Sequence, residues 1–312
     1  MPVMDGKQEN MTGVKLTKRI IKVPPDPRVQ EWMKYDSVML REVWTMQASV
    51  FKLMKVMENM TASFVAQCEA VINDDRLMKQ LAEEKFDVGI SETFDMCGLG
   101  IFEALKIPSS IATFSGVHMD VVSKSIGEPI IPSYVPGAVV TTGDRMTFIE
   151  RLTNAAHAVI GQFFFGSTFT KEVQSFRSKF GPQFKDYDAK KIYSKSSKAC
   201  LKRRSYGNTK KKVQNWPITS RMSTLLHGHL KMPFLMPIFA DQTRNANMLA
   251  KHGTGIVLTK FALEHPQVLR DSLRRIFTDE SFSQNAKRLS AMLLNQPITA
   301  KQLLIRHSEF AA

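Results

Sequence analysis

The chain has 312 residues, of which 43% are hydrophobic and 23% are charged, and its formal net charge is +14. This composition supports a globular enzyme that can bury one large or two medium hydrophobic cores. Cys68, Cys97 and Cys200 lie far apart in the sequence, without metal-binding or redox spacing, so no disulfide framework can be argued from them.

The ends of the chain bear on where it is located. The first residues, MPVMDGKQENMTG, lack the basic and apolar regions of a signal peptide. The longest apolar runs fall far short of the ~20 residues that a membrane span needs. We therefore expect the chain as written to be cytosolic. Asn10-Met11-Thr12 and Asn59-Met60-Thr61 are N-glycosylation acceptor triplets, which we expect to stay unmodified in that compartment.

The first two thirds of the chain alternate between helical and strand patterns. Residues 29–84 are predicted to be helical, and their many methionines fit a core or the lining of an acceptor pocket. We then predict a short buried strand over 86–90, a helix from Gly98 to Ile107, a strand over 110–114 and a helix over 146–165. This order predicts an α/β fold with a parallel sheet.

Residues 189–213 are strongly basic, since they include ten Lys or Arg residues and no acid. Apolar periodicity disappears there, which predicts a flexible linker over 189–216. A basic run with interspersed tyrosines is also compatible with polyanion binding. No nucleic-acid motif accompanies it, so a solvated linker is the favoured interpretation, and no specific nucleic acid is expected as a partner.

The most informative stretch follows, from Phe234 to Leu258. It predicts a buried strand over 234–239, a helix opened by Asp241 and closed near Gly253, and a second strand over 255–258. Asp241 and Gln242 are predicted to lie where a strand's carboxyl end meets a helix N-terminus, a common ligand site in α/β folds. They can hydrogen-bond vicinal sugar hydroxyls. Alternatively, Asp241 is only the N-cap and Gln242 a solvated first-turn residue.

The residue order of this stretch, PIFADQTRNANMLAKHG, resembles the signature of the UDP-glycosyltransferases, and of the UDP-glucuronosyltransferase branch in particular. The resemblance reappears in FDVGISETFDMCGLGIFEALKIP, GEPIIPSYVPG and DRMTFIERL. It implies a GT-B fold, in which two Rossmann-like domains contain parallel sheets, both incomplete here. Residues 1–188 would be an acceptor-binding domain lacking its first strand, 189–216 the linker or junction, and 217–312 a partial UDP-sugar-binding domain.

The resemblance also implies a reaction. A sugar, glucuronic acid or glucose, would pass with inversion from a UDP-sugar to a small lipophilic acceptor; the UDP-sugar is a co-substrate, and no cofactor or metal is implied. Asp241 and Gln242 would hold the donor sugar. Glu92 would orient a general-base histidine, which the resemblance places upstream of Met1. Alternatively, Glu92 is a strand-end carboxylate that faces solvent or caps a helix. His118 is the only histidine near a strand end of the acceptor domain, and it does not match that position.

The first half of the donor signature departs from the family pattern. Ser223 and Thr224 match and are candidate phosphate-binding residues, but Ile218–Ser220 replace His-Gly-Gly and Leu226 replaces a glutamate. In an alternative alignment His227-Gly228 is the remnant of His-Gly-Gly, but the Ser-Thr and Glu positions are then deleted, so the signature is incomplete in both. Small residues let backbone N–H groups approach a diphosphate, and the acid accepts ribose hydroxyls. We therefore expect impaired transfer. The alternative is a non-catalytic relative that binds or regulates full-length enzymes as a homo- or hetero-oligomer. The family is anchored in the endoplasmic reticulum membrane and faces the lumen, unlike the cytosolic location expected for the chain as written.

Overall fold

The computed structural model describes residues 19–32, 34, 50–113, 120–125, 129–137, 145–188, 234–238 and 242–311. The chain forms two compact units. The first comprises 1–113, 163–197 and the terminal residue 312, and the second comprises 114–162 and 198–311. The division into domains over 1–188 and 217–312 stays a prediction, because residues 189–233 lie outside the described part.

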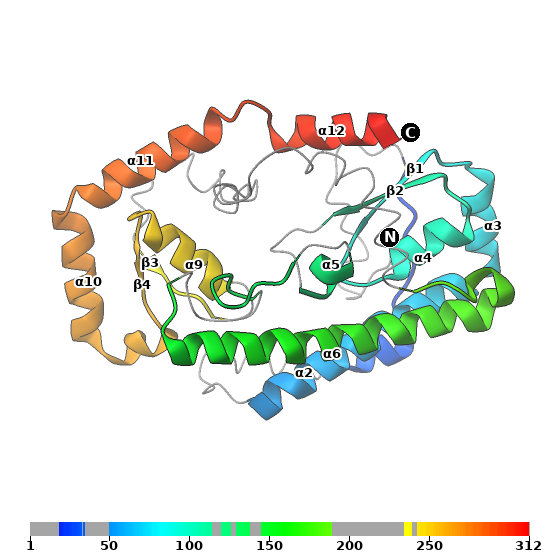
Figure 1. Ribbon diagram of the computed structural model, residues 1–312, viewed down its shortest axis with the longest axis horizontal. Helices are drawn as coiled ribbons and strands as arrows, with labels where there is room; N and C mark the ends of the chain where they lie inside the picture. Colours follow the sequence, from blue (N-terminus) through cyan, green and yellow to red (C-terminus); the bar gives the residue numbers. More distant parts are fainter. Residues whose placement is uncertain are drawn as a thin grey trace. The chain divides into compact units, whose positions relative to one another are not determined.

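The described elements alternate as a mixed α/β chain (Figure 1). The first unit contains α2 (Val50–Asn73), α3 (Asp75–Glu83), β1 (Val88–Glu92), α4 (Cys97–Ala104), β2 (Ser109–Thr113) and η2 (Gly181–Phe184). Helix α6 (Phe148–Phe180) contributes residues to both units. In the second unit they are α5 (Asp120–Ser125), β3 (Phe234–Leu235), α9 (Gln242–Lys251), β4 (Ile256–Val257), η3 (Lys260–Glu264), α10 (Pro266–Thr278), α11 (Ser281–Leu294) and α12 (Ala300–Ala311).

The structure is helical over 27–32 and again in α2 and α3. The helix predicted over 29–84 is therefore present but not continuous. Asp74 separates α2 from α3, and its side chain accepts a hydrogen bond from the Leu77 N–H at 2.9 Å. This is N-capping, in which an acid satisfies an N–H group that has no partner inside the helix. The sequence signal for this break was therefore present in Asp74 itself.

Strands β1 and β2 form a parallel pair in the register Ile90 to Ile111 and Glu92 to Thr113. Helix α4 connects them and contacts both. It packs closely on β1, since a methyl group added at Gly89 would overlap the Phe102 ring. The prediction of a buried strand over 86–90 is wrong in burial: Ile90 is 46% exposed, because within the described residues this sheet has only two strands.

Helix α6 is far longer than the predicted helix over 146–165. It continues to Phe180 because its C-terminal half has a buried face, in which Phe169, Val173 and Phe176 recur at helical spacing. Phe176 packs over Gly100 of α4, where an added methyl group would overlap its ring. The helix ends at Gly181, whose φ of 59° is the left-handed conformation that glycine adopts readily.

An aromatic cluster closes the C-terminal end of α6. The ring of Phe184 lies 5.1 Å from that of Phe176, 5.5 Å from that of Phe180 and 4.6 Å from that of Tyr187. The Tyr187 hydroxyl donates to the Leu99 carbonyl of α4 at 3.1 Å. Aromatic pairs at these distances add stability beyond their buried area. The cluster therefore fastens α6 and η2 to α4.

The second unit contains the predicted strand–helix–strand. Strands β3 and β4 are parallel and pair Phe234 with Ile256, and α9 lies between them in sequence. Gly253, with φ of 67°, follows the C-terminus of α9 as predicted. The strand, helix and strand predicted over 234–258 are therefore confirmed, although the strands are shorter than expected.

Candidate functional site

Glu92 is the last residue of β1, and its side chain is exposed at the carboxyl end of the strand. The turn that follows is fixed to β2, because the backbone N–H and the hydroxyl of Thr93 both donate to the Thr113 carbonyl, at 2.9 and 3.1 Å. The Thr113 hydroxyl donates back to the Ser91 carbonyl at 3.1 Å. These bonds hold the backbone around Glu92 in a defined geometry.

Two further carboxylates converge on the turn between Glu92 and α4. Asp95 accepts a hydrogen bond from the Cys97 N–H at 3.0 Å, and Glu172 of α6 accepts one from the Met96 N–H at 2.7 Å. Glu172 is fully buried. Two N–H groups at the N-terminus of α4, which have no partner inside the helix, are thus satisfied by acids of the chain itself.

The electrostatics of this turn are unusual. Burial raises the pKa of Glu172 well above its ordinary value, and the charge of Asp95 raises it further, against the hydrogen bond from Met96. The pKa of Asp95 is also raised, mainly by burial, with a smaller contribution from Glu92. Desolvation and like charge both favour the neutral acid. Such environments occur at functional sites and in structural networks alike.

Sequence reasoning missed Asp95 and Glu172, although both left a signal. Asp95 precedes the Cys97–Ala104 helix at a position typical of a capping acid. Glu172 lies three residues after Phe169 and four before Phe176, so helical periodicity places it on the buried face. An acid at a predicted core position indicates a specific partner inside the fold.

A disulfide joins Cys68 of α2 to Cys97, the first residue of α4, with a Cα–Cα distance of 5.6 Å. The spacing of the three cysteines in the sequence had given no ground for predicting this bond. The two residues are 29 positions apart, and only the packing of α2 against α4 brings them together. The bond joins α2 to the end of the turn that follows Glu92.

At the donor side, Gln242 is the first residue of α9 and follows β3, as predicted. Its side-chain oxygen accepts a hydrogen bond from the Ile238 N–H at 2.9 Å and so braces the strand-to-helix turn. Asp241, Ser223 and Thr224 lie outside the described residues, as does His118. Glu92 and Gln242 belong to different units, each described by itself.

The second unit also contains a charged pair near Gln242. Burial raises the pKa of Asp120, at the start of α5, and the positive charge of Arg244 partly offsets this effect. Arg244 follows Gln242 by two residues in α9. Helix α5 thus approaches the first turns of the helix that carries the predicted sugar-binding residue.

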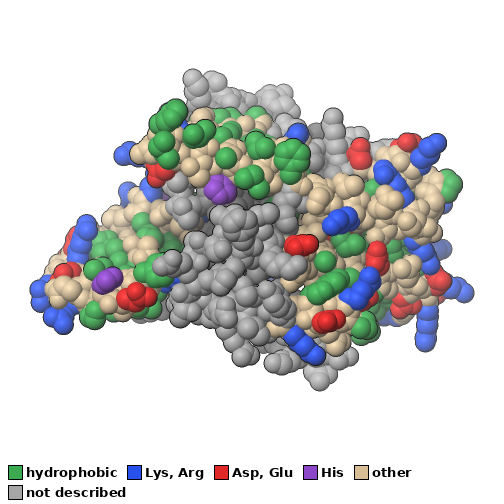
Figure 2. Space-filling view, turned by 90° about the horizontal axis from the view of Figure 1, so that it is seen from below, with side chains coloured by type: hydrophobic (Ala, Val, Ile, Leu, Met, Phe, Trp, Pro, Cys, Tyr) green, Lys and Arg blue, Asp and Glu red, His purple; other side chains and the backbone are tan. Residues whose placement is uncertain are grey.

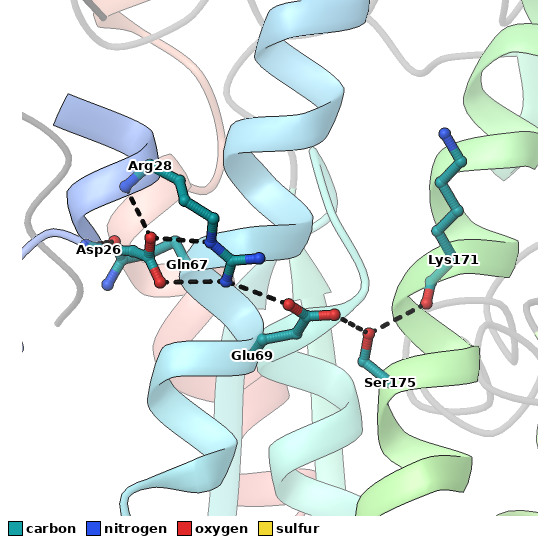
Figure 3. Close-up of polar contacts among 6 residues, drawn as sticks. All are labelled: Asp26, Arg28, Gln67, Glu69, Lys171 and Ser175. Atoms are coloured by element: carbon teal, nitrogen blue, oxygen red, sulfur yellow. Dashed lines mark hydrogen bonds and ion pairs between the residues drawn. The ribbon is translucent and has the colours of Figure 1, made fainter. Parts of the chain in front are cut away.

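A polar cleft of about 320 Å³ lies between α2 and α6 in the first unit. Figure 3 shows the network beside it, in which Arg28 bonds Asp26 through two nitrogens and Glu69 through Nη2 at 3.1 Å. Ser175 of α6 donates to Glu69 at 3.0 Å. The Arg28 hydrogen bond lowers the pKa of Asp26. None of the predicted site residues lines the cleft. We therefore assign the network a structural role: it holds the segment with Asp26 and Arg28 against α2, and α2 against α6.

The described residues contain no group of His, Cys, Asp and Glu side chains arranged to hold a metal ion. Among the described helices, none is long and apolar enough to cross a membrane. Hydrophobic side chains nevertheless gather in patches on the face drawn in Figure 2, with Lys and Arg at its margins. Among the described large hydrophobic residues, Phe148 and Phe163 of α6 have the highest exposed fractions, 76% and 77%.

Comparison with known proteins identifies the family. The family model of UDP-glucoronosyl and UDP-glucosyl transferase matches residues 7–204 and 224–311, most of the chain. The chain therefore belongs to this family. The stretch that the family model leaves unmatched includes Ile218–Ser220, where the sequence departs from the donor signature.

The relatives agree with this assignment. The chain is 34% identical over 131 residues to UDP-glucuronosyltransferase 2B17 of Mus musculus, a match that covers 41% of the chain and 24% of the relative. It is 30% identical over 168 residues to the putative UDP-glucuronosyltransferase ugt-56 of Caenorhabditis elegans, covering 54% and 30%. The chain thus matches less than a third of the length of these relatives. No solved structure matches it significantly.

Proposed function

We propose that the chain contributes to transfer of a sugar from a UDP-sugar to a small lipophilic acceptor, within a GT-B architecture of two Rossmann-like domains. One observation carries the proposal: family membership extends over both the stretch around Glu92 and the stretch around Gln242. The described parallel strand pairs, each with a helix between its strands in sequence, are compatible with that architecture.

In the proposed reaction, a histidine general base removes the proton of the acceptor hydroxyl. The acceptor oxygen then bonds to the anomeric carbon on the face opposite the leaving group, and the bond from that carbon to the diphosphate oxygen breaks, releasing UDP. Glu92 suits the role of orienting acid, because its exposed carboxylate stands on a braced strand end and can accept an imidazole N–H.

At the donor side, Asp241 and Gln242 would bind the sugar hydroxyls, and Ser223 and Thr224 the phosphates. The UDP-sugar, with glucuronic acid or glucose as its sugar, is the co-substrate, and no cofactor takes part. The position of Gln242 at the first turn of α9 supports this assignment, since ligands of α/β sheets bind at the carboxyl ends of strands.

Calorimetric titration with UDP-glucuronate and UDP-glucose tests the donor site. We expect Gln242→Ala and Asp241→Ala each to weaken binding roughly 5- to 150-fold, since a lost buried polar contact costs about 1–3 kcal/mol. Gln267→Ala is the matched control, because Gln267 is an exposed helical glutamine that bonds only Asp271 in the described contacts. Binding of either nucleotide sugar that is unchanged by both site variants would contradict the assignment.

The location of the chain also enters the proposal. The expectation of a cytosolic chain stays a prediction, and the Cys68–Cys97 disulfide weighs against it. Disulfides persist in oxidising compartments and are rare in the cytosol, where thiols are kept reduced. We therefore propose an oxidising compartment as the place where the described fold is stable.

Even in a secretory compartment, we expect Asn59 to remain unglycosylated. It lies in the interior of α2 and is half-buried, and the Thr61 hydroxyl of its triplet is buried against that of Thr168 at 3.1 Å. A glycan is bulky and needs a surface position. The measurement is gel mobility before and after glycosidase treatment of the chain fused to a signal peptide, carrying Asn10→Gln so that only Asn59 is read.

Arg288→Asn in the same fusion provides the control, because it creates an acceptor triplet with Ser290 at an exposed position of α11. We expect this control to shift in mobility and the background chain to show no shift. A shift of the background chain that Asn59→Gln removes would show that α2 does not pack on α6 as described.

A further inference from the structure

We propose that Glu172 is a positioning residue for Glu92: from α6 it fixes the backbone of Met96 and so holds the turn that follows Glu92. The contact crosses 76 residues of sequence, and it is short, at 2.7 Å. Met96 is itself buried at the base of the turn, between Glu92 at the end of β1 and the first residue of α4. The functional meaning of this contact rests on the proposed role of Glu92.

Three observations indicate that the contact is specific. Glu172 is fully buried, although a charged side chain in such a place is strongly disfavoured without a partner. Its Oε2 takes the Met96 N–H, whereas its Oε1 has no hydrogen-bond partner among the described residues. A single bond to the backbone of the turn is thus the polar contact that the described residues give this acid.

The surroundings leave Glu172 little freedom to move. One turn further along α6, Phe176 packs on Gly100 of α4, where an added methyl group would overlap the ring. The disulfide from Cys97 to Cys68 fastens the other side of the turn to α2. The turn is therefore attached to both α6 and α2, and displacing Glu172 removes its attachment to α6.

The charges around Glu172 make the stability of the folded chain depend on pH. The groups that act on it are acids, since Asp95 raises its pKa and Glu92 raises that of Asp95. With burial, these charges keep Glu172 neutral in the folded chain at pH values where it is ionised in the unfolded chain. The folded state then binds more protons, so stability falls as the pH rises from the ordinary pKa of 4.5 towards the raised one.

Glu172→Leu and Glu172→Gln separate the positioning role from simple burial. Leucine fills the space without an acceptor, whereas glutamine keeps an oxygen for the Met96 N–H and cannot ionise. Hydrogen–deuterium exchange of the Met96 amide is the first readout. We expect exchange to rise at least about tenfold in Glu172→Leu and to stay within about threefold of the parent in Glu172→Gln. Glu83→Gln, an exposed acid of α3, is the control.

Denaturant unfolding between about pH 5 and about pH 8 is the second readout. We expect the unfolding constant of the parent chain and of Glu83→Gln to rise by up to about tenfold per pH unit in the part of this range where Glu172 would lose its proton on unfolding. In Glu172→Gln this contribution disappears. If Glu172→Leu does not fold, the parent and Glu172→Gln still decide the question.

Equal protection of Met96 in all variants would overturn the proposal, and so would identical pH dependence of the parent chain and Glu172→Gln. Neither readout involves a ligand. Failure of UDP-sugar binding would therefore count against the proposed function alone, and loss of the Met96 contact would count against the positioning role alone.

Discussion

Replacement of Cys97 by serine is expected to lower the free energy of unfolding of the first unit by about 3–4 kcal/mol. The disulfide closes a loop with a sequence separation of 29, and a cross-link of that length restricts the unfolded chain by about this amount. Denaturant unfolding followed by circular dichroism measures the loss. Cys68→Ser should have the same effect, because each variant removes the same bond.

Cys200→Ser is the control, since it removes the cysteine that takes no part in this disulfide. We also expect a reducing agent to destabilise the parent chain and Cys200→Ser, but to leave Cys97→Ser unchanged. A parent chain whose unfolding midpoint does not respond to reduction would contradict the disulfide. The two units can unfold separately, so each transition has to be fitted on its own.

Replacement of Phe184 by alanine is expected to cost about 3–5 kcal/mol, the range for a large aromatic side chain lost from a packed core. Phe184 is fully buried and its ring contacts those of Phe176, Phe180 and Tyr187. Thermal unfolding is the measurement, with Phe163→Ala as the matched control. Phe163 is 77% exposed on α6, so its loss should change stability by less than about 0.5 kcal/mol.

Comparable effects of Phe184→Ala and Phe163→Ala would show that the aromatic cluster does not form the core of this end of the unit. The variants also bear on the proposed site. The Tyr187 hydroxyl bonds the Leu99 carbonyl of α4, so loosening of the cluster should reach the helix that begins at Cys97. Faster disulfide reduction in Phe184→Ala than in Phe163→Ala is the expected sign.

Much of the site's local framework could be read from the sequence. Gly253 ends α9 because glycine adopts a positive φ at little cost, and Gln242 lies in the first turn of that helix because it directly follows Asp241, a residue type that favours helix starts. These features depend on neighbours within a few residues. The family assignment was likewise accessible, since it depends on the order of residues along the chain, and the match to the family model confirms it.

The sequence thus determined the family and the strand–helix–strand around Gln242, and it indicated a strand close before Glu92. Only the tertiary structure decided that Cys68 bonds Cys97, that α6 continues past 165, and that Glu172 reaches the Met96 N–H. The reason is physical: helix caps and turns arise from local hydrogen bonds and backbone preferences, whereas these three features require residues 29 to 76 positions apart to meet or a helix face to be covered by another helix.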